Sequence, residues 1–111
     1  MSQVKIPRSA IAVSVAAAGT TTTDAGLLQS GSFQVFRTSA ADDTKGVRLH
    51  ADYDHTGVVV EIANGVSNKI LKVYPPTGGA INGAAANAAF SSVSGAGVRL
   101  ICLSPGVWAG R

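Results

Sequence analysis

The stretch His50-Ala51-Asp52-Tyr53-Asp54-His55 is the one part of the sequence where potential metal ligands gather. Alternation along a strand would place His50, Asp52 and Asp54 on one side, and two carboxylates beside an imidazole can bind a divalent cation. No CxxC or HExxH spacing supports such a site. A polar loop that follows a strand ending at Leu49 explains the same residues. The sequence therefore predicts a loop and no metal site.

The other side chains that could take part in catalysis form no recognisable arrangement. The sequence has no Gly-x-Ser-x-Gly elbow, and Ser30 and Ser94 each precede a glycine in a turn, where serine is common. Three of the six acidic residues stand in turn-forming clusters: Asp24, Asp42 and Asp43. The glycine-rich run 78–83 lacks the lysine and the following helix of a phosphate-binding loop. The sequence predicts no enzyme activity and no cofactor.

The composition indicates a small domain that makes contacts with other subunits. A chain of 111 residues forms one domain, and its 5% aromatic content leaves a core of mostly small side chains. Charged residues make up 14%, well below the roughly one-quarter that is usual for soluble domains. The nine basic residues are spread from Lys5 to Arg111 without a run, which argues against nucleic-acid binding. A net charge of +3 suits docking on an acidic protein lattice.

The single cysteine and the apolar segments bear on the compartment. Cys102 lies in the apolar run 98–103 and is expected to be a buried small hydrophobe in a protein made in a reducing cytoplasm. No segment reaches the roughly 18 apolar residues of a membrane span. The alternation of Ile11, Val13 and Val15 favours a strand over a signal peptide. We therefore expect no membrane partner.

Period-two patterning runs through the chain and predicts an all-β fold. The expected strands are residues 11–16, 32–38, 46–49, 57–64, 69–74, 89–93 and 98–104, with a short last strand at 107–108. Clusters of turn-forming residues separate them, at 19–24, 40–45, 75–79, 82–83, 94–97 and 104–106. Many short strands at this spacing predict a small antiparallel β-sandwich or a jelly-roll-like domain.

One strand pair can be assigned a register. A four-residue loop, 65–68, would join strands 57–64 and 69–74 as a hairpin that sets Ile62 against Leu71 and Glu61 against Lys72. Strand 98–103 is apolar on both faces apart from Arg99, which predicts an interior strand or one covered by a neighbouring subunit. Trp108 is expected to fill the core rather than to be an exposed recognition aromatic.

The first nine residues are expected to form an extended arm, and residues 10–111 a single β domain. The segment is polar, and Pro7 denies it a helix. An arm of this kind lies on another chain. Its candidate contact residues are Lys5, Ile6, Pro7 and Arg8.

The second half of the chain carries a family resemblance. The segment LKVYPPTGGAINGAAANA, from Leu71 to Ala88, is followed by Gly95, the apolar strand 98–103 and Trp108. This pattern resembles small structural proteins of tailed bacteriophages, a loose group that includes head-decoration (cement) proteins, and it is similar to β modules of phage tail fibres. Residues 44–47 match more weakly. The resemblance offers no functional residues to transfer, and it implies a virion part, commonly a trimeric β-sandwich.

These observations lead to one leading functional hypothesis and two alternatives. The first is a capsid decoration protein that is made in the host cytoplasm and binds the major capsid protein as a homotrimer on the outer surface of the virion. The second is a trimeric tail-fibre or spike module that recognises a host surface glycan through Trp108, Tyr53 and the 50–55 loop. A neck or tail connector subunit is the third.

Overall fold

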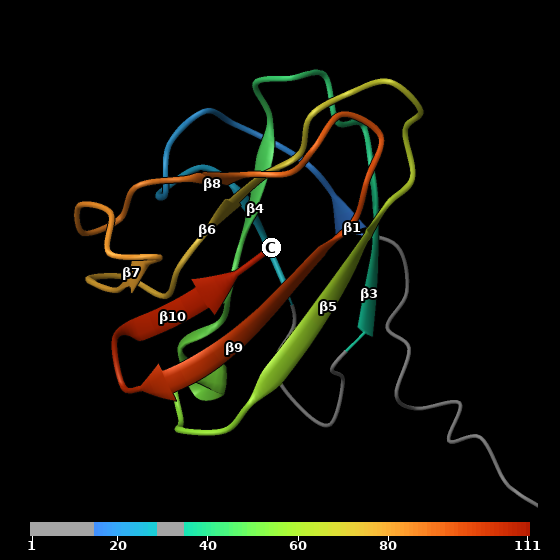
Figure 1. Ribbon diagram of the computed structural model, residues 1–111. Helices are drawn as coiled ribbons and strands as arrows, with labels where there is room; N and C mark the ends of the chain where they lie inside the picture. The colour runs from blue at the N-terminus through green and yellow to red at the C-terminus, as the bar shows by residue number, and fades with distance from the viewer. Residues whose placement is uncertain (1–14, 29–34) are drawn as a thin grey trace, which may run out of the picture.

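The computed structural model describes residues 15–28 and 35–111, which are almost entirely strands and turns (Figure 1). The strands are β1 (Val15–Ala16), β2 (Gly26–Leu27), β3 (Val35–Ser39), β4 (Gly46–Arg48), β5 (Val59–Asn64), β6 (Lys72–Tyr74), β7 (Ala80–Ile81), β8 (Phe90–Ser91), β9 (Val98–Ser104) and β10 (Val107–Gly110). The short 3-10 helix η2 (Ala51–Tyr53) lies between β4 and β5. The predicted arm, residues 1–9 with Lys5, Ile6, Pro7 and Arg8, lies outside the described residues.

The strands form two sheets that pack against each other. The six-stranded sheet has the order β1-β3-β5-β9-β10-β7, and the four-stranded sheet has the order β2-β4-β6-β8. In Figure 1 the strands β5, β9 and β10 lie in front of β4 and β6. The chain alternates between the sheets from β1 to β6, so that each strand lies beside the strand two elements earlier.

These stacked strands run parallel and give a β-solenoid-like arrangement. In the six-stranded sheet Val15 pairs with Thr38, and Thr38 pairs with Asn64. In the four-stranded sheet Gly26 pairs with Val47, and Val47 pairs with Val73. The recurring register means that one coil of the chain takes roughly 25 residues, a length within the range of known solenoid repeats.

Antiparallel strands close the last coil. β9 pairs antiparallel with β5 on one side and with β10 on the other, and β8 pairs antiparallel with β6. β7 adds a parallel strand beyond β10. The prediction that strand 98–103 lies in the interior of a sheet is therefore confirmed. Its outward side chains nevertheless remain accessible, because the burial of β9 alternates residue by residue.

The prediction of an all-β chain is confirmed, whereas the antiparallel sandwich or jelly roll is wrong. β5 and β6, expected to form a hairpin, lie in different sheets. The Asn64 side chain directs the chain away from a hairpin, since its Nδ2 donates to the Lys69 carbonyl at 2.7 Å and its Oδ1 accepts from the Val66 amide at 3.0 Å. Gly65 then donates to the Thr38 carbonyl at 3.0 Å, where a Cβ would collide with the same oxygen. Residues 64–69 thus form a corner between sheets.

The expected pair of Glu61 with Lys72 is consequently also wrong. Glu61 stands opposite Arg99 in the β5–β9 ladder, and Arg99 Nε lies 3.5 Å from Glu61 Oε1. Lys72 belongs to the four-stranded sheet, where its Nζ donates to Ser91 Oγ at 2.7 Å. Alternation along β5 correctly separated buried from exposed residues, but it does not specify which strand lies alongside.

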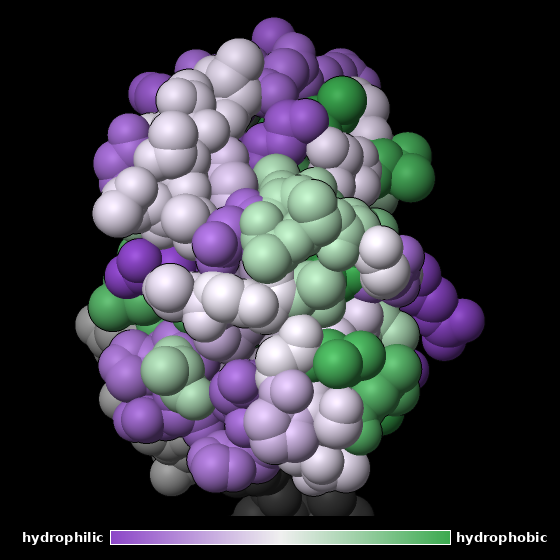
Figure 2. All heavy atoms as spheres, turned by 90° about the vertical axis from the view of Figure 1, so that its left-hand side faces the viewer, coloured by the Kyte–Doolittle hydropathy of each residue, from purple (hydrophilic) through white to green (hydrophobic). Residues whose placement is uncertain are grey.

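The core lies between the sheets and contains the inward side chains of every coil. Phe36, Ile62 and Val98 follow one another across the six-stranded sheet, and all three are buried. Trp108 and Cys102 form a cross-strand pair and are each 1% exposed, which confirms both as core residues. The surface seen from the side of β7 mixes polar and apolar residues, with apolar ones gathered at the lower right, toward the turn from β9 to β10 (Figure 2).

Exchanging the charges of the β5–β9 pair tests the register. Glu61→Lys places like charges opposite each other and should lower the free energy of unfolding by up to about 1 kcal/mol. Adding Arg99→Glu should restore most of the loss, and adding Lys72→Glu should restore none. The measurement is urea denaturation of all single and double variants. Energetic coupling of Glu61 to Lys72 instead of Arg99 would show that β5 and β6 form a hairpin, and it would overturn the coiled arrangement.

Candidate interaction surface

The segment 50–55 does not have the strand geometry that would bring its possible ligands together. His50 caps η2, and its Nδ1 accepts from the Asp52 amide at 3.0 Å. The Asp52 carboxylate stays on the same side, 3.6 Å from that nitrogen. Asp54 turns the other way, toward β9 and β10. Within residues 15–28 and 35–111 no group of three or more His, Cys, Asp or Glu side chains is arranged to hold a metal ion.

Asp54, which the sequence offered only as a possible metal ligand, is a structural acceptor. Its Oδ1 accepts from the Gly106 amide at 2.7 Å and from the Trp108 indole Nε1 at 3.1 Å, and it lies 3.7 Å from Cys102 Sγ. Burial raises the pKa of the Cys102 thiol, and the neighbouring carboxylate of Asp54 raises it further. Asp54 therefore fixes the turn between β9 and β10, and Cys102 remains a protonated core residue.

The alternative receptor surface of Trp108, Tyr53 and the 50–55 loop lacks both of its aromatics, although the loop itself is partly exposed. Trp108 is 1% exposed, and Tyr53 is 4% exposed with its ring edge-on to Phe36 at a centroid distance of 6.0 Å. Burial raises the pKa of the Tyr53 hydroxyl. Both aromatics are held inside because alternation and the η2 turn direct them toward the core.

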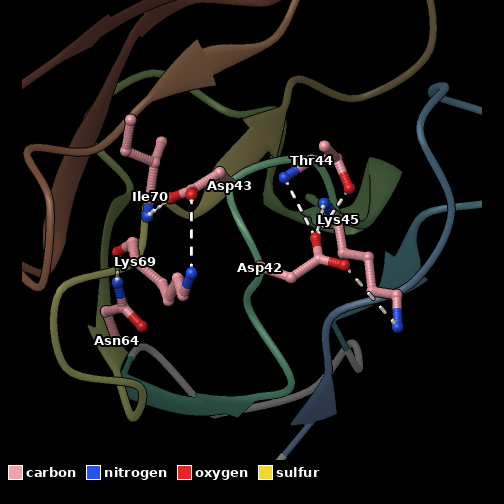
Figure 3. Close-up of polar contacts among 7 residues, drawn as sticks. All are labelled: Asp42, Asp43, Thr44, Lys45, Asn64, Lys69 and Ile70. Carbon is pink, nitrogen blue, oxygen red and sulfur yellow. Dashed lines mark hydrogen bonds and ion pairs between the residues drawn. The ribbon is translucent and has the colours of Figure 1, made fainter.

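The carboxylates predicted to lie in turns do lie there, and they hold the corners of the coils (Figure 3). Asp42 Oδ1 accepts from the Thr44 hydroxyl at 2.6 Å and from the amides of Thr44 and Lys45, and these bonds lower its pKa to about 2. Asp43 reaches the next coil, because its Oδ1 accepts from the Ile70 amide at 2.7 Å. Lys69 Nζ lies 3.8 Å from the other oxygen of Asp43.

A similar arrangement holds the corner of the first coil. Asp24 Oδ1 accepts from the Thr21 hydroxyl at 2.7 Å and from the amides of Thr20 and Thr21. The Thr21 hydroxyl is the main cause of a lowered pKa of Asp24. The carboxylates of Asp24 and Asp42 both accept from local backbone amides and hydroxyls, which gives each a structural role in a turn.

The outward face of β5, β9 and β10 carries three of the exposed large apolar residues of the described chain. Ile101, Leu103 and Val107 are 38%, 54% and 46% exposed. Val59 stands directly opposite Ile101 across the ladder, and Ala109 stands opposite it on the other side. These five residues form an aliphatic strip across three strands, which we call the β9–β10 face. The apolar residues gathered at the lower right of Figure 2 lie toward this part of the molecule.

Arginines border this strip. Arg99 and Arg111 stand next to each other, with their backbone amides and carbonyls exchanging hydrogen bonds of 2.9 and 3.0 Å. Arg37 lies further off, on β3 opposite Ala63, on the same side of the sheet. Glu61 is the one carboxylate that the ladder places among them, and it is paired with Arg99. The surroundings of the strip are therefore positively charged.

Two adjoining shallow grooves run over this surface. The first has a volume of about 320 Å³ and is lined by Val59, Arg99, Ile101, Ala109, Gly110 and Arg111. The second has a volume of about 430 Å³, shares Arg99 and Arg111, and extends to Val35 and Glu61. Sequence alternation could have found this face, because Arg99, Ile101 and Leu103 are the outward residues of a strand that is apolar on both sides.

Comparison of the chain with protein-family models, with curated proteins and with solved structures gives no match. Over residues 15–28 and 35–111 there is also no helix with the length and apolar character needed to cross a membrane.

Removing the Asp54 carboxylate should destabilise the core. Asp54→Ala leaves the buried indole N–H of Trp108 without its acceptor, at an expected cost of about 1–3 kcal/mol in the free energy of unfolding. Asp54→Asn keeps one oxygen and should lose less, and Asp52→Ala is the control because its side chain is exposed. Denaturant titration followed by Trp108 fluorescence measures all three. Equal stability of Asp54→Ala and the wild type would contradict the acceptor role.

Asp42 should make stability depend on acidic pH. Because its pKa falls from 3.8 to about 2 on folding, its stabilising effect is fully present above 3.8 and is lost as the pH falls towards 2. Asp42→Asn keeps an acceptor oxygen and does not titrate, so its melting temperature should fall less over this range. Calorimetry from pH 5 to about 2 measures the difference. Parallel curves for the two proteins would show that the turn does not depend on the charge.

Proposed function

We propose that this chain is a structural protein of a tailed-phage virion that binds the outer surface of the capsid as a homotrimer and stabilises it. The observation that carries the proposal is the β9–β10 face, an exposed aliphatic strip bordered by arginines on a rigid sheet. Such a surface suits attachment to an acidic protein lattice. The resemblance of residues 71–108 to head-decoration proteins points to the same role.

The fold contributes rigidity to this role. The protein has stacked coils in place of the trimeric sandwich that the resemblance implies. The surface and the composition therefore support the decoration role, and the fold type does not. The buried ladder of Phe36, Ile62 and Val98 holds β3, β5 and β9 in register beneath the face. A pre-organised surface loses little conformational entropy on binding. Many copies, each attached to neighbouring capsid subunits, together would resist the internal pressure of packaged DNA.

The arm has a separate part in the proposal. Lys5, Ile6, Pro7 and Arg8 would lie extended on an adjacent capsid or decoration subunit, where backbone hydrogen bonds and Ile6 provide the contact. Two charges contribute little beside these contacts, so this attachment should depend only moderately on salt.

A tail-fibre module is the second candidate, because stacked parallel coils suit an extended rod. Trp108 and Tyr53 are core residues and cannot form the receptor surface that the sequence suggested for such a module. Copy number on the particle separates the two candidates: hundreds of copies on the shell indicate decoration, and a handful at the tail indicate a fibre. Electron microscopy of labelled particles gives this number.

Attachment to stripped particles tests the decoration role. Intact protein added back should occupy the shell in many copies and raise the temperature at which particles release DNA. Deletion of residues 1–8 should abolish attachment while the domain keeps its melting temperature, because the deleted residues supply no run of core side chains. Native mass spectrometry of the free protein should give a trimer. A monomer that never binds the shell would overturn the proposal, and full rebinding of the truncated protein would remove the arm from it.

A further inference from the structure

We propose that the β9–β10 face binds an extended acidic segment of another protein chain, with an aliphatic side chain of that segment resting on Ile101 and neighbouring carboxylates meeting the adjacent pair Arg99 and Arg111. The inference rests on the proposed function in one respect only, since the capsid subunit would be the source of the segment.

The apolar part of the face accepts a side chain from a partner. The groove of about 320 Å³ has Val59, Ile101 and Ala109 in one row across three strands, with Gly110 beside them. This row crosses the strands, and the groove lies over the middle of the six-stranded sheet. A bound segment therefore lies across the sheet and is recognised through side chains, in contrast to a strand added at an edge.

The charge around the groove selects the partner. In the described part of the chain no carboxylate side chain forms an ion pair with Arg111, and Arg99 forms one with Glu61 alone. Arg99 and Arg111 form a row beside the row of Val59, Ile101 and Ala109. Arginine binds carboxylates through two parallel hydrogen bonds, so acidic residues next to an aliphatic one can reach the arginine row while the aliphatic side chain rests on Ile101. A second copy of the same face would bring its arginines against these, which disfavours a face-to-face dimer.

A protein segment fits this face better than a nucleic acid does. The exposed residues of the strip are aliphatic, and the β9–β10 face presents no aromatic ring on which a base could stack. An aliphatic groove adds nothing to phosphate binding, whereas it buries a leucine-type side chain. Binding to a protein segment should therefore keep part of its strength in salt.

Fluorescence polarisation with a labelled synthetic peptide tests the proposal. The probe has two leucines separated and flanked by aspartates, and its matched controls replace either all aspartates by asparagine or both leucines by serine. We expect the probe to bind and each control to bind at least about tenfold more weakly. No binding of the probe, or equal binding of all three peptides, overturns the inference.

Variants of the protein locate the binding. Arg111→Glu and Ile101→Ser should each weaken probe binding about tenfold. Lys72→Glu makes the same charge change on the four-stranded sheet, and Val93→Ser removes an apolar side chain that is 76% exposed in a loop; both should bind within about twofold of the wild type. Circular dichroism confirms that each variant is folded. Equal effects of the face and control variants place the binding elsewhere and overturn the inference.

Further probes separate this inference from its rivals and from the proposed function. Single-stranded DNA or anionic vesicles that bind through Arg111 while the peptide does not would replace the protein segment by a nucleic acid or a membrane. Stripped particles that take up Arg111→Glu at wild-type occupancy overturn the face as a capsid contact and leave the decoration role intact. Peptide binding without attachment to particles supports the face and counts against the decoration role.

Discussion

Parallel stacking of the coils is the constraint on which the rest of this structure depends. Parallel neighbours cannot be joined by a tight hairpin, so the chain must leave each sheet after one strand and return after crossing the other. Thr38 illustrates the result, because it pairs with Val15 before it and with Asn64 after it. Its buried hydroxyl donates to the Ala63 carbonyl at 3.0 Å, so that the coils are also linked inside the core. The partners of β3 to β6 follow from this crossing.

The corners make the crossings possible. A chain that turns between sheets leaves backbone amides without a strand partner. Side-chain oxygens of Asp24, Asp42 and Asn64 accept hydrogen bonds from such amides. Asp43 goes further and joins its corner to the next coil through Ile70, with a left-handed backbone that an aspartate tolerates (φ 76°). These short polar residues are the turn formers that the sequence shows between its apolar runs. The carboxylates of Asp24, Asp42 and Asp43 are thus engaged in holding the corners.

Sequence patterning predicted the elements better than their pairing. Alternation correctly identified the buried residues of β5 and β9, and the apolar surroundings of Cys102 and Trp108 correctly predicted their burial. The strands β2 and β7 were missed because two residues are too few to show a period. The coil repeat was missed because residues in the same register, such as Val15, Thr38 and Asn64, share no chemistry. The fold followed from long-range pairing, which no local pattern specifies.

The same alternation explains why the β9–β10 face is open. Inward residues of β9 are covered by the opposite sheet, while Ile101 and Leu103, which point outward, are covered by no layer formed by residues 15–28 or 35–111. Folding does not require apolar residues at these positions, because a polar side chain in an outward position loses no core contact. Exposed aliphatic residues make a protein less soluble unless a partner covers them. Their concentration beside Arg99 and Arg111, with the single carboxylate of Glu61 already engaged, therefore favours a surface that is covered in the working assembly by apolar and acidic groups together.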